Sequence, residues 1–250
     1  MLLARRSVVR TLRQPAMVVP SLVFPLMLLA INSSGLESTT RLPGFPTDSF
    51  FQFALAIPFV QGALFSANSA GTNIASDIET GFLNRLSLTP LRRVALMLGQ
   101  LTGILALGLI QAITFVGVGL AFGTGIEAGA GGVVVIVALS LTISLAFGCI
   151  GAFVALRSGS GESVQGVFPL FFAALFLSSM SMPRNLIEID WFQTIANWNP
   201  VSYMLEGIRS LVITGWDGEA LALGFACAGG IALIALAGAS SALRTRMVRT

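Results

Sequence analysis

Residues 94–126, VALMLGQLTGILALGLIQAITFVGVGLAFGTGI, form a run of 33 positions without Asp, Glu, Lys or Arg. An α-helix needs about 20 apolar residues to cross the hydrocarbon core of a bilayer. Outside this run lie five more uncharged stretches of at least 21 residues, and together the six predict six transmembrane helices. The other five comprise residues 14–36, 49–76, 128–156, 163–183 and 220–243.

The amino-acid composition supports a membrane environment. Of the 250 residues, 55% are hydrophobic and 10% are charged, whereas about 25% of the residues in a soluble domain are charged. The apolar runs are continuous rather than alternating, which disfavours a β-barrel, and in lipid a helix satisfies its own backbone hydrogen bonds. We therefore expect an all-α integral membrane protein with a single transmembrane domain over residues 1–250.

The distribution of Arg predicts an orientation. All 14 basic residues are Arg, and basic residues in short loops tend to stay on the cytoplasmic side. With six spans, Arg41, Arg184 and Arg209 fall on one side and the remaining Arg on the other. Both termini are therefore expected in the cytoplasm, and the complete absence of Lys favours a bacterial source and hence the inner membrane. The Arg on the inner side are Arg5, Arg6, Arg10, Arg13, Arg85, Arg92, Arg93, Arg157, Arg244, Arg246 and Arg249.

The residue types that are missing limit the chemistry of the chain. A Walker A loop needs a Lys to hold the phosphates of ATP, and this chain has none. It also has no His, the commonest participant in metal binding and acid–base catalysis. Cys149 and Cys227 fall within apolar stretches and are interpreted as small packing residues. We expect no catalytic site, metal or cofactor in the chain, and no nucleic-acid partner.

Two further segments are expected to lie along the membrane surface. In residues 1–13, Arg6, Arg10 and Arg13 recur on one side, which predicts an interfacial helix; five more apolar stretches follow, which disfavours a cleaved export signal. Residues 184–219 hold all three Trp and the one Tyr, and these residue types prefer the membrane–water interface. We expect this segment to form short re-entrant helices in the outer leaflet before the last span.

Polar side chains recur along two of the predicted spans. Gln61, Asn68 and Thr72 share one face of the second span, and Gln111 belongs to a similar stripe on the third. A polar stripe in a membrane helix faces other protein or water. Two interpretations remain open, namely hydrogen bonding between helices and the lining of a path for a transported substrate.

An aromatic face is predicted in the fifth span. Phe168, Phe172 and Phe176 recur every four residues, which places their rings on one side of a helix. Contact with lipid or core packing is one interpretation. The sharper interpretation is a surface for an amphipathic or polycyclic substrate at a subunit interface, and we include these residues in the predicted substrate path.

Residues 76–93 form the longest predicted loop on the Arg-rich side. Ser76 and Glu79 have the spacing of a helix N-terminal capping box. Ile78, Phe82 and Leu86 would give this helix one apolar face. Thr89 and Pro90 would end the helix, since Pro suits the first turn of the next helix. We expect a short coupling helix along the inner membrane surface that docks a partner ATPase.

With this loop, the sequence resembles the ABC-2-type permease family, in particular its daunorubicin-exporter-like branch. The loop pattern is matched by Asp77, Glu79, Gly81, Leu83, Leu86, Thr89 and Pro90. A second match precedes the last span, with Pro183, Trp191, Asn199, Pro200, Glu206 and Arg209 in a similar order. Arg13, Gln14 and Pro15 fit the entry of the first helix into the membrane.

The resemblance implies a permease subunit of an ATP-driven exporter. The complete transporter would pair this chain with a second permease, identical or related, and with two ATPase subunits that bind ATP and Mg²⁺. The substrate would be drug-like or lipid-like and amphipathic, with export of a glycan or lipid-linked polymer as the alternative. A secondary transporter is disfavoured because the predicted spans contain no ionisable acid or base for ion coupling. The expected ATPase-docking residues are Asp77, Ile78, Glu79, Gly81, Phe82, Arg85, Leu86, Thr89 and Pro90.

Overall fold

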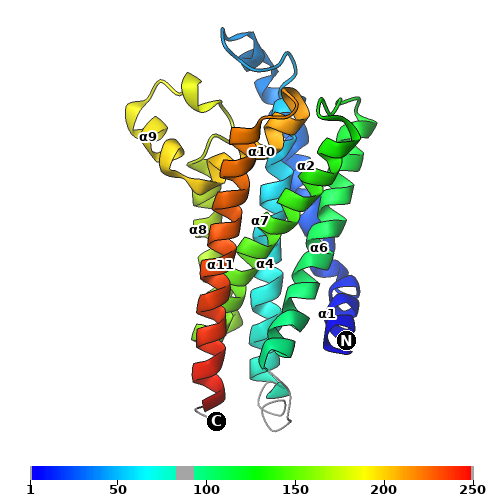
Figure 1. The fold of residues 1–250 in the computed structure, drawn as a ribbon, viewed down its shortest axis with the longest axis vertical. Helices are drawn as coiled ribbons and strands as arrows, with labels where there is room; N and C mark the ends of the chain where they lie inside the picture. Colours follow the sequence, from blue (N-terminus) through cyan, green and yellow to red (C-terminus); the bar gives the residue numbers. More distant parts are fainter. Residues whose placement is uncertain (1, 83–92, 249–250) are drawn as a thin grey trace.

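The structure is a computed structural model that describes residues 2–82 and 93–248. Figure 1 shows an elongated bundle of roughly antiparallel helices, with both chain termini at the same end. We call this end the N/C end, and we call the opposite end, where several short helices lie, the loop end. Within the described residues all regular elements are helices, so the predicted all-α membrane fold is confirmed at this level.

Long helices run along the bundle, and short ones cover its ends. A helix at the N/C end occupies the predicted interfacial segment, and three short helices occupy most of residues 184–219. In chain order the elements are α1 (Leu2–Leu12), α2 (Pro15–Leu36), η1 (Glu37–Arg41), α3 (Phe50–Ala54), α4 (Ala56–Glu79), α6 (Arg93–Ala121), α7 (Gly129–Ser158), α8 (Gly161–Phe176), η2 (Arg184–Leu186), α9 (Asp190–Trp198), α10 (Pro200–Ile213) and α11 (Gly218–Val248).

Among the described residues, five helical segments are long and apolar enough to cross a membrane. They comprise Pro15–Arg41, Phe50–Glu79, Gly99–Ala121, Gly129–Ser158 and Gly218–Arg246. The remaining predicted span, the fifth in chain order, corresponds to α8, which has only 16 residues. A helix of this length extends about 24 Å, less than the roughly 30 Å of a hydrocarbon core. The structure therefore supports five of the six predicted spans by length.

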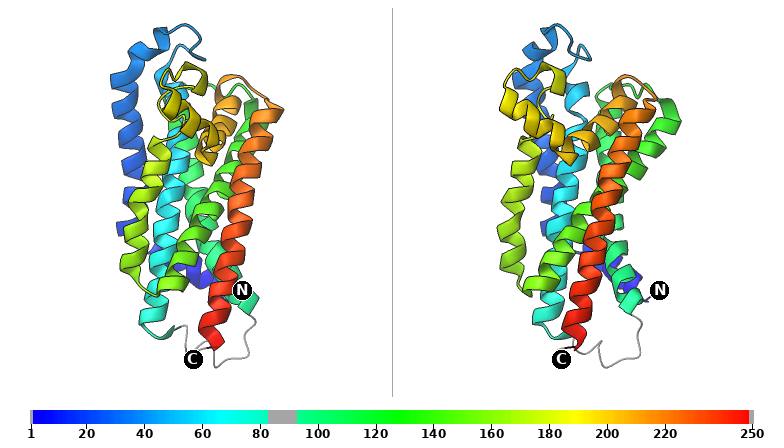
Figure 2. Two further views of the ribbon diagram at one scale, coloured as in Figure 1. Left: turned by 90° about the vertical axis from the view of Figure 1, so that its left-hand side faces the viewer. Right: turned by 60° about the vertical axis from the view of Figure 1, so that its left-hand side comes forward.

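α4 is the central helix of the bundle, although it is the least apolar of the five segments. It packs against α2, α6, α7, α8 and α10, and the views in Figure 2 place it among these helices. Of its most apolar window, 83% is buried, compared with 17% for α2. In lipid, polar groups are stable only inside the protein, which explains why the helix with the most polar side chains occupies the centre.

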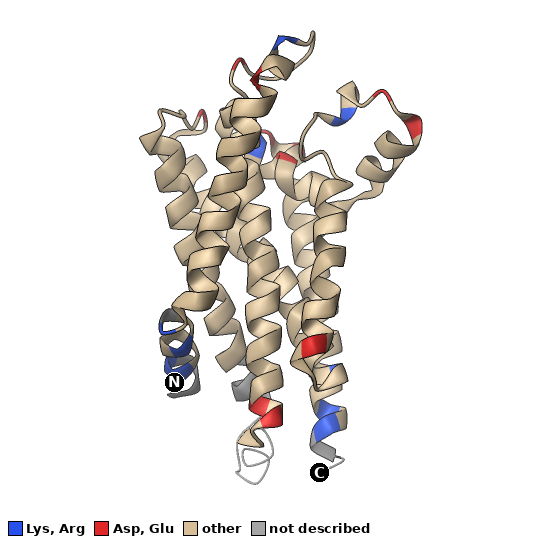
Figure 3. Ribbon diagram, turned by 180° about the vertical axis from the view of Figure 1, so that it is seen from behind, with Lys and Arg blue, Asp and Glu red and all other residues tan. Residues whose placement is uncertain are grey.

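The peripheral helices show the reverse pattern. On α2, Val19, Val23, Met27 and Ile31 recur every four residues and are each about half exposed. Lipid tails are as apolar as these side chains, so an exposed apolar stripe costs little there. Figure 3 shows that charged residues gather at the two ends of the bundle and leave the middle without charge. Both features are those of a helix bundle surrounded by lipid.

Glycines bring α4 and α7 into close contact. A Cβ built on Gly151 of α7 would lie only 2.0 Å from the backbone oxygen of Ala67 in α4. On the facing side, a Cβ on Gly71 of α4 would lie 2.9 Å from the backbone oxygen of Gly151. Backbone atoms cannot move aside as a flexible side chain can, so this crossing of the two most central helices requires glycine.

We predict that Gly151→Ala destabilises the bundle, because the added methyl group forces α4 and α7 apart. Gly166→Ala in α8 is the matched control, since a Cβ at Gly166 has no neighbour within 4 Å and a helical Ala is favoured over Gly by about 1 kcal/mol. Thermal unfolding in detergent should show a lower midpoint for Gly151→Ala and an unchanged or higher midpoint for Gly166→Ala. Equal midpoints for the two variants would contradict the close approach.

Candidate functional site

The predicted docking loop begins at the N/C end of α4. The capping pattern predicted a helix that begins at Ser76, and this prediction is wrong. Instead α4 continues through Ser76–Glu79 and ends at Thr80, whose amide is bonded to the Ser76 carbonyl. Gly81 then takes a left-handed conformation with φ +67°. The capping spacing was misread because α4 extends beyond the apolar stretch. The remaining docking residues, Arg85, Leu86, Thr89 and Pro90, lie outside the described residues.

Asp77 is buried beneath the N-terminal helix. Its Oδ1 accepts hydrogen bonds from Arg10 at 2.8 Å and from Arg6 at 3.2 Å, and its side chain is 7% exposed. The Arg6 guanidinium also lies 3.7 Å from the centroid of the Phe82 ring. A buried carboxylate is stable only with such partners. Two of the nine predicted docking residues are thus already joined to α1, and the ion pairs connect α1 to the point where α4 ends.

The neighbouring docking residues also contact the bundle. Ile78 is partly buried against a small apolar cluster at the N/C end, which includes Ile74 of α4 and Ala155 of α7. Glu79 is exposed, and its Oε1 accepts a hydrogen bond of 3.4 Å from the backbone amide of Gly161 at the start of α8. The end of α4 therefore contacts α1, α7 and α8 together.

The polar residues of the predicted substrate path differ in whether they have hydrogen-bond partners. Gln111 of α6 accepts a hydrogen bond of 3.3 Å from Ser66, and Thr72 donates to the carbonyl of Asn68 within its own helix. Gln111 thus bonds between helices through its Oε1, although its buried Nε2 has no partner among the described residues. The bond of Thr72 is not between helices and supports neither interpretation. Gln61 is fully buried, and in the described part of the chain neither of its amide atoms has a hydrogen-bond partner. The buried Oδ1 of Asn68 is in the same situation.

An aromatic cluster separates Gln61 from Asn68. Phe65 lies between them on α4 and contacts Phe24 of α2 as well as Phe168 and Phe172 of α8, with ring centroids 5.5–6.5 Å apart. Phe168 and Phe172 are thus packed within the protomer, whereas Phe176 is 55% exposed. The predicted aromatic face is divided between an internal cluster and an open surface.

Arg209 of α10 holds the loop end together. Its guanidinium donates hydrogen bonds to the backbone oxygens of Phe53 (3.0 Å), Ser179 (2.6 Å) and Met180 (2.6 Å), and it stacks on the Phe53 ring. Burial lowers the pKa of Arg209 to about 9, an effect that the carboxylate of Glu206 opposes, so the group stays cationic at neutral pH. The sequence analysis used Arg209 for the orientation and within a motif, but did not predict its bonds to backbone carbonyls. The signal available was one Arg among apolar neighbours, Ile208 and Leu211.

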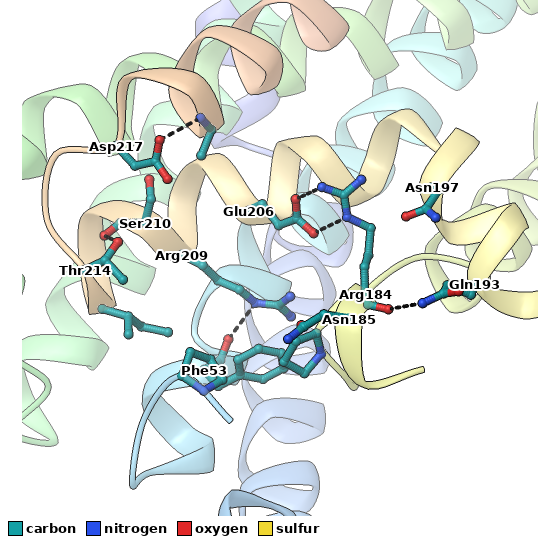
Figure 4. Close-up of a pocket in the computed structure, with 14 residues that line it drawn as sticks. Phe53, Arg184, Asn185, Gln193, Asn197, Glu206, Arg209, Ser210, Thr214 and Asp217 are labelled. Atoms are coloured by element: carbon teal, nitrogen blue, oxygen red, sulfur yellow. Dashed lines mark hydrogen bonds and ion pairs between the residues drawn. The ribbon is translucent and has the colours of Figure 1, made fainter. Parts of the chain in front are cut away.

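A cavity of about 600 Å³ opens beside Arg209 (Figure 4). Arg184 and Glu206 form a two-bond ion pair in its wall, with distances of 2.7 and 2.5 Å. We call this cavity the loop-end pocket. It is lined by Pro46, Phe53, Pro183, Arg184, Asn185, Gln193, Asn197, Glu206, Arg209, Ser210, Ile213, Thr214, Asp217 and Ala220.

These features define a class of protein. The chain is a multi-pass helical membrane protein whose charged clusters lie at the two ends, and no group of His, Cys, Asp and Glu residues in the described part could hold a metal ion. The chain belongs to the ABC-2 type transporter family, whose model matches residues 1–213. Members of this family are transmembrane subunits that are not catalytic alone and typically work with an ATPase subunit.

Two individual relatives are also named as transport permeases. The chain is 26% identical over 172 residues to the daunorubicin resistance ABC transporter permease protein DrrB1 of Streptomyces coeruleorubidus; the match covers 66% of this chain and 59% of that protein. It is 27% identical over 212 residues to the putative transport permease ycf38 of Pyropia yezoensis, covering 84% of this chain and 72% of the relative. The chain thus spans less than two thirds of the length of the daunorubicin relative.

We predict that Asp77→Asn loosens α1 from the bundle, since the two Arg lose a buried carboxylate. Removing a charged hydrogen-bond partner costs roughly 1–3 kcal/mol. Limited proteolysis should cut the region around α1 faster than in the parent chain. Glu162→Gln is the control, because Glu162 is an exposed acid that directly follows Gly161, whose amide contacts Glu79 at the end of α4. Identical cleavage in both variants would show that the ion pairs do not hold α1.

Proposed function

We propose that the chain is the membrane subunit of an ATP-driven exporter. The family match over residues 1–213, which includes α1 and the end of α4, carries this proposal. The complete transporter would contain two permease chains, identical or related, and two copies of a separate ATPase subunit that binds ATP and Mg²⁺. The absence of Lys, and hence of a Walker A loop, supports this division of labour.

We further propose six membrane crossings, with both termini in the cytoplasm of a bacterial cell and the loop end outside. The common position of the two termini supports an even number of crossings. α8 would make the short crossing together with the non-helical residues that follow it. The excess of Arg in the expected inner segments supports the orientation. The short helices η2, α9 and α10 would then be the expected re-entrant segment, in the outer leaflet.

Force from the ATPase would enter through residues 76–93. Because Asp77 binds α1 and Glu79 contacts α8, a displacement at this point would move three helices together. α4 would transmit the movement, since it runs the length of the bundle at its centre. The contacts of Arg6 with Asp77 and Phe82 make α1 part of the proposed coupling element.

The substrate would be an amphipathic drug-like or lipid-like molecule. The unpaired amide atoms of Gln61 and the buried Oδ1 of Asn68, on either side of Phe65, support this choice. Parting of α8 from α4 would expose these unpaired polar atoms within a phenylalanine-rich surface, which suits a ring system with hydrogen-bonding groups. Phe176, exposed on the same helix, would extend this surface toward a second permease. Thr72, which already bonds within its own helix, would contribute less. Gln111 would offer its Nε2, which has no partner in the described part of the chain.

The exit from α4 offers a direct test. Gly81 adopts φ +67°, and a Cβ there would meet nothing within 4 Å, so substitutions act through the backbone alone. Gly81→Pro cannot keep this conformation because the ring fixes φ near −65°, whereas Gly81→Asn tolerates it. We expect both variants to insert in the membrane. Gly81→Pro should lose co-purification with the ATPase and transport-coupled ATP hydrolysis, and Gly81→Asn should retain both.

The matched pair separates docking from folding. The membrane fraction of each variant measures insertion, and the retained ATPase measures docking. If Gly81→Pro binds the ATPase and supports hydrolysis as the parent does, the segment is an ordinary connector. If the parent chain itself retains no ATPase subunit and hydrolyses ATP alone, the proposed function is wrong.

A further inference from the structure

α9 separates two different environments at the loop end. Trp191, Ile195 and Trp198 recur at i, i+4 and i+7 and are 60%, 38% and 85% exposed. Gln193 and Asn197 lie on the opposite side of the helix and line the loop-end pocket. Figure 1 shows α9 projecting sideways from the bundle near the end of α8. The helix thus carries an open apolar face on one side and a wall of a polar cavity on the other.

The apolar face of α9 fits a membrane interface. Trp is enriched where the headgroups meet the hydrocarbon, because its ring is apolar and its N–H is polar. Leu170 and Phe176 of α8, the helix that precedes this segment in the chain, are also exposed. We take lipid in the leaflet at the loop end, rather than a second protein, as the occupant of this face, because two of its three residues are exposed Trp, the residue type enriched where headgroups meet the hydrocarbon.

The loop-end pocket contains two positive and two negative side chains. Arg184 is paired with Glu206, and Arg209 is held by three carbonyls. Asp217 uses Oδ1 to cap α11 through the amides of Glu219 and Ala220. The wall is therefore electrically balanced. An anion alone would meet both carboxylates and a cation alone both guanidinium groups, whereas a ligand that carries both charges can pair with each kind.

We propose that the loop-end pocket binds the zwitterionic headgroup of a phospholipid in the adjacent leaflet. The phosphate would face Arg184 and Arg209, and the ammonium group would face Glu206 and Asp217. The acyl chains would leave the mouth of the pocket and enter the leaflet in which the Trp191, Ile195 and Trp198 face of α9 is embedded. The cavity of about 600 Å³ lies within the range of small-molecule sites, about 300–1,000 Å³. The site uses neither the ATPase nor the predicted substrate path, so it stands apart from the proposed function.

The test uses the full chain, purified in detergent and freed of lipid. Phosphatidylethanolamine, phosphatidylglycerol and the soluble headgroup glycerophosphoethanolamine are each titrated, with native mass spectrometry and thermal unfolding as the measurements. We expect phosphatidylethanolamine to bind and to raise the unfolding midpoint. Phosphatidylglycerol, which lacks the ammonium group, should bind about tenfold more weakly, as expected for one lost charged hydrogen bond. The soluble headgroup should bind weakly because it lacks acyl chains.

Two variants locate the site. Asp217→Asn keeps the α11 cap, since Asn caps as well as Asp, but removes a carboxylate from the pocket; we expect a loss of about tenfold in phosphatidylethanolamine binding. Asp190→Asn, an exposed acid of α9 that does not line the pocket, should leave binding unchanged. Equal binding of both phospholipids would overturn the zwitterion assignment. Equal binding of the soluble headgroup would overturn the lipid assignment, and an unaffected Asp217→Asn variant would place the lipid elsewhere.

Discussion

In lipid, each backbone carbonyl must find a hydrogen-bond donor within the protein. Where a helix is interrupted, its carbonyls lose their donors in the next turn, so another part of the chain must supply a donor there. α3 ends at Ala54, just before α4 begins, and α8 ends at Phe176 after only 16 residues. Arg209 donates to the carbonyls of Phe53, Ser179 and Met180, which lie at these two breaks. A cation near helix C-termini is also favoured by the helix dipoles. One guanidinium thus joins α3, the end of α8 and α10, and it forms part of the loop-end pocket.

The opposite end of α4 has a complementary arrangement. There the buried carboxylate of Asp77 accepts hydrogen bonds from two Arg of α1. At the loop end, the buried Arg209 donates hydrogen bonds to three backbone carbonyls. Between these two charged junctions the bundle is uncharged and packed through glycines, as at Gly151. α4 takes part in both junctions, through Phe53 just before it and Asp77 near its end. A helix that is anchored near both ends and buried along most of its length is suited to move as a unit, which is what the proposed coupling to an ATPase requires.

The sequence predicted the parts of the fold that depend on composition. Five of the uncharged stretches correspond to helices of membrane-spanning length. Composition suffices here because the free energy of transfer into lipid depends on the polarity of each residue by itself. The remaining stretch, residues 163–183, is uncharged throughout, yet α8 ends at Phe176. Asn199 donates to the carbonyl of Ala174 in the last turn of α8, and Arg209 donates to the carbonyls of Ser179 and Met180 beyond it. The Arg209–Phe53 contact joins residues that are 156 positions apart, and the Arg10–Asp77 contact joins residues 67 positions apart. Neither contact can be predicted from a local sequence pattern. The helix start predicted at Ser76 was wrong for a related reason, because α4 extends beyond its apolar stretch to Glu79. The docking residues Arg85, Leu86, Thr89 and Pro90 and the substrate path stay predictions.

Replacement of Arg209 measures the central claim directly. Arg209→Met keeps much of the side-chain volume but leaves three carbonyls without their donor, each at a cost of roughly 1–3 kcal/mol. The thermal unfolding midpoint in detergent should fall by roughly 10 °C or more, and Arg209→Lys should recover only part of the loss because an ammonium group lacks the planar fork. Arg41→Met, at an exposed position of the same end, should unfold as the parent does. If Arg209→Met unfolds at the same temperature as Arg41→Met, the helix breaks are satisfied in another way and the account is contradicted.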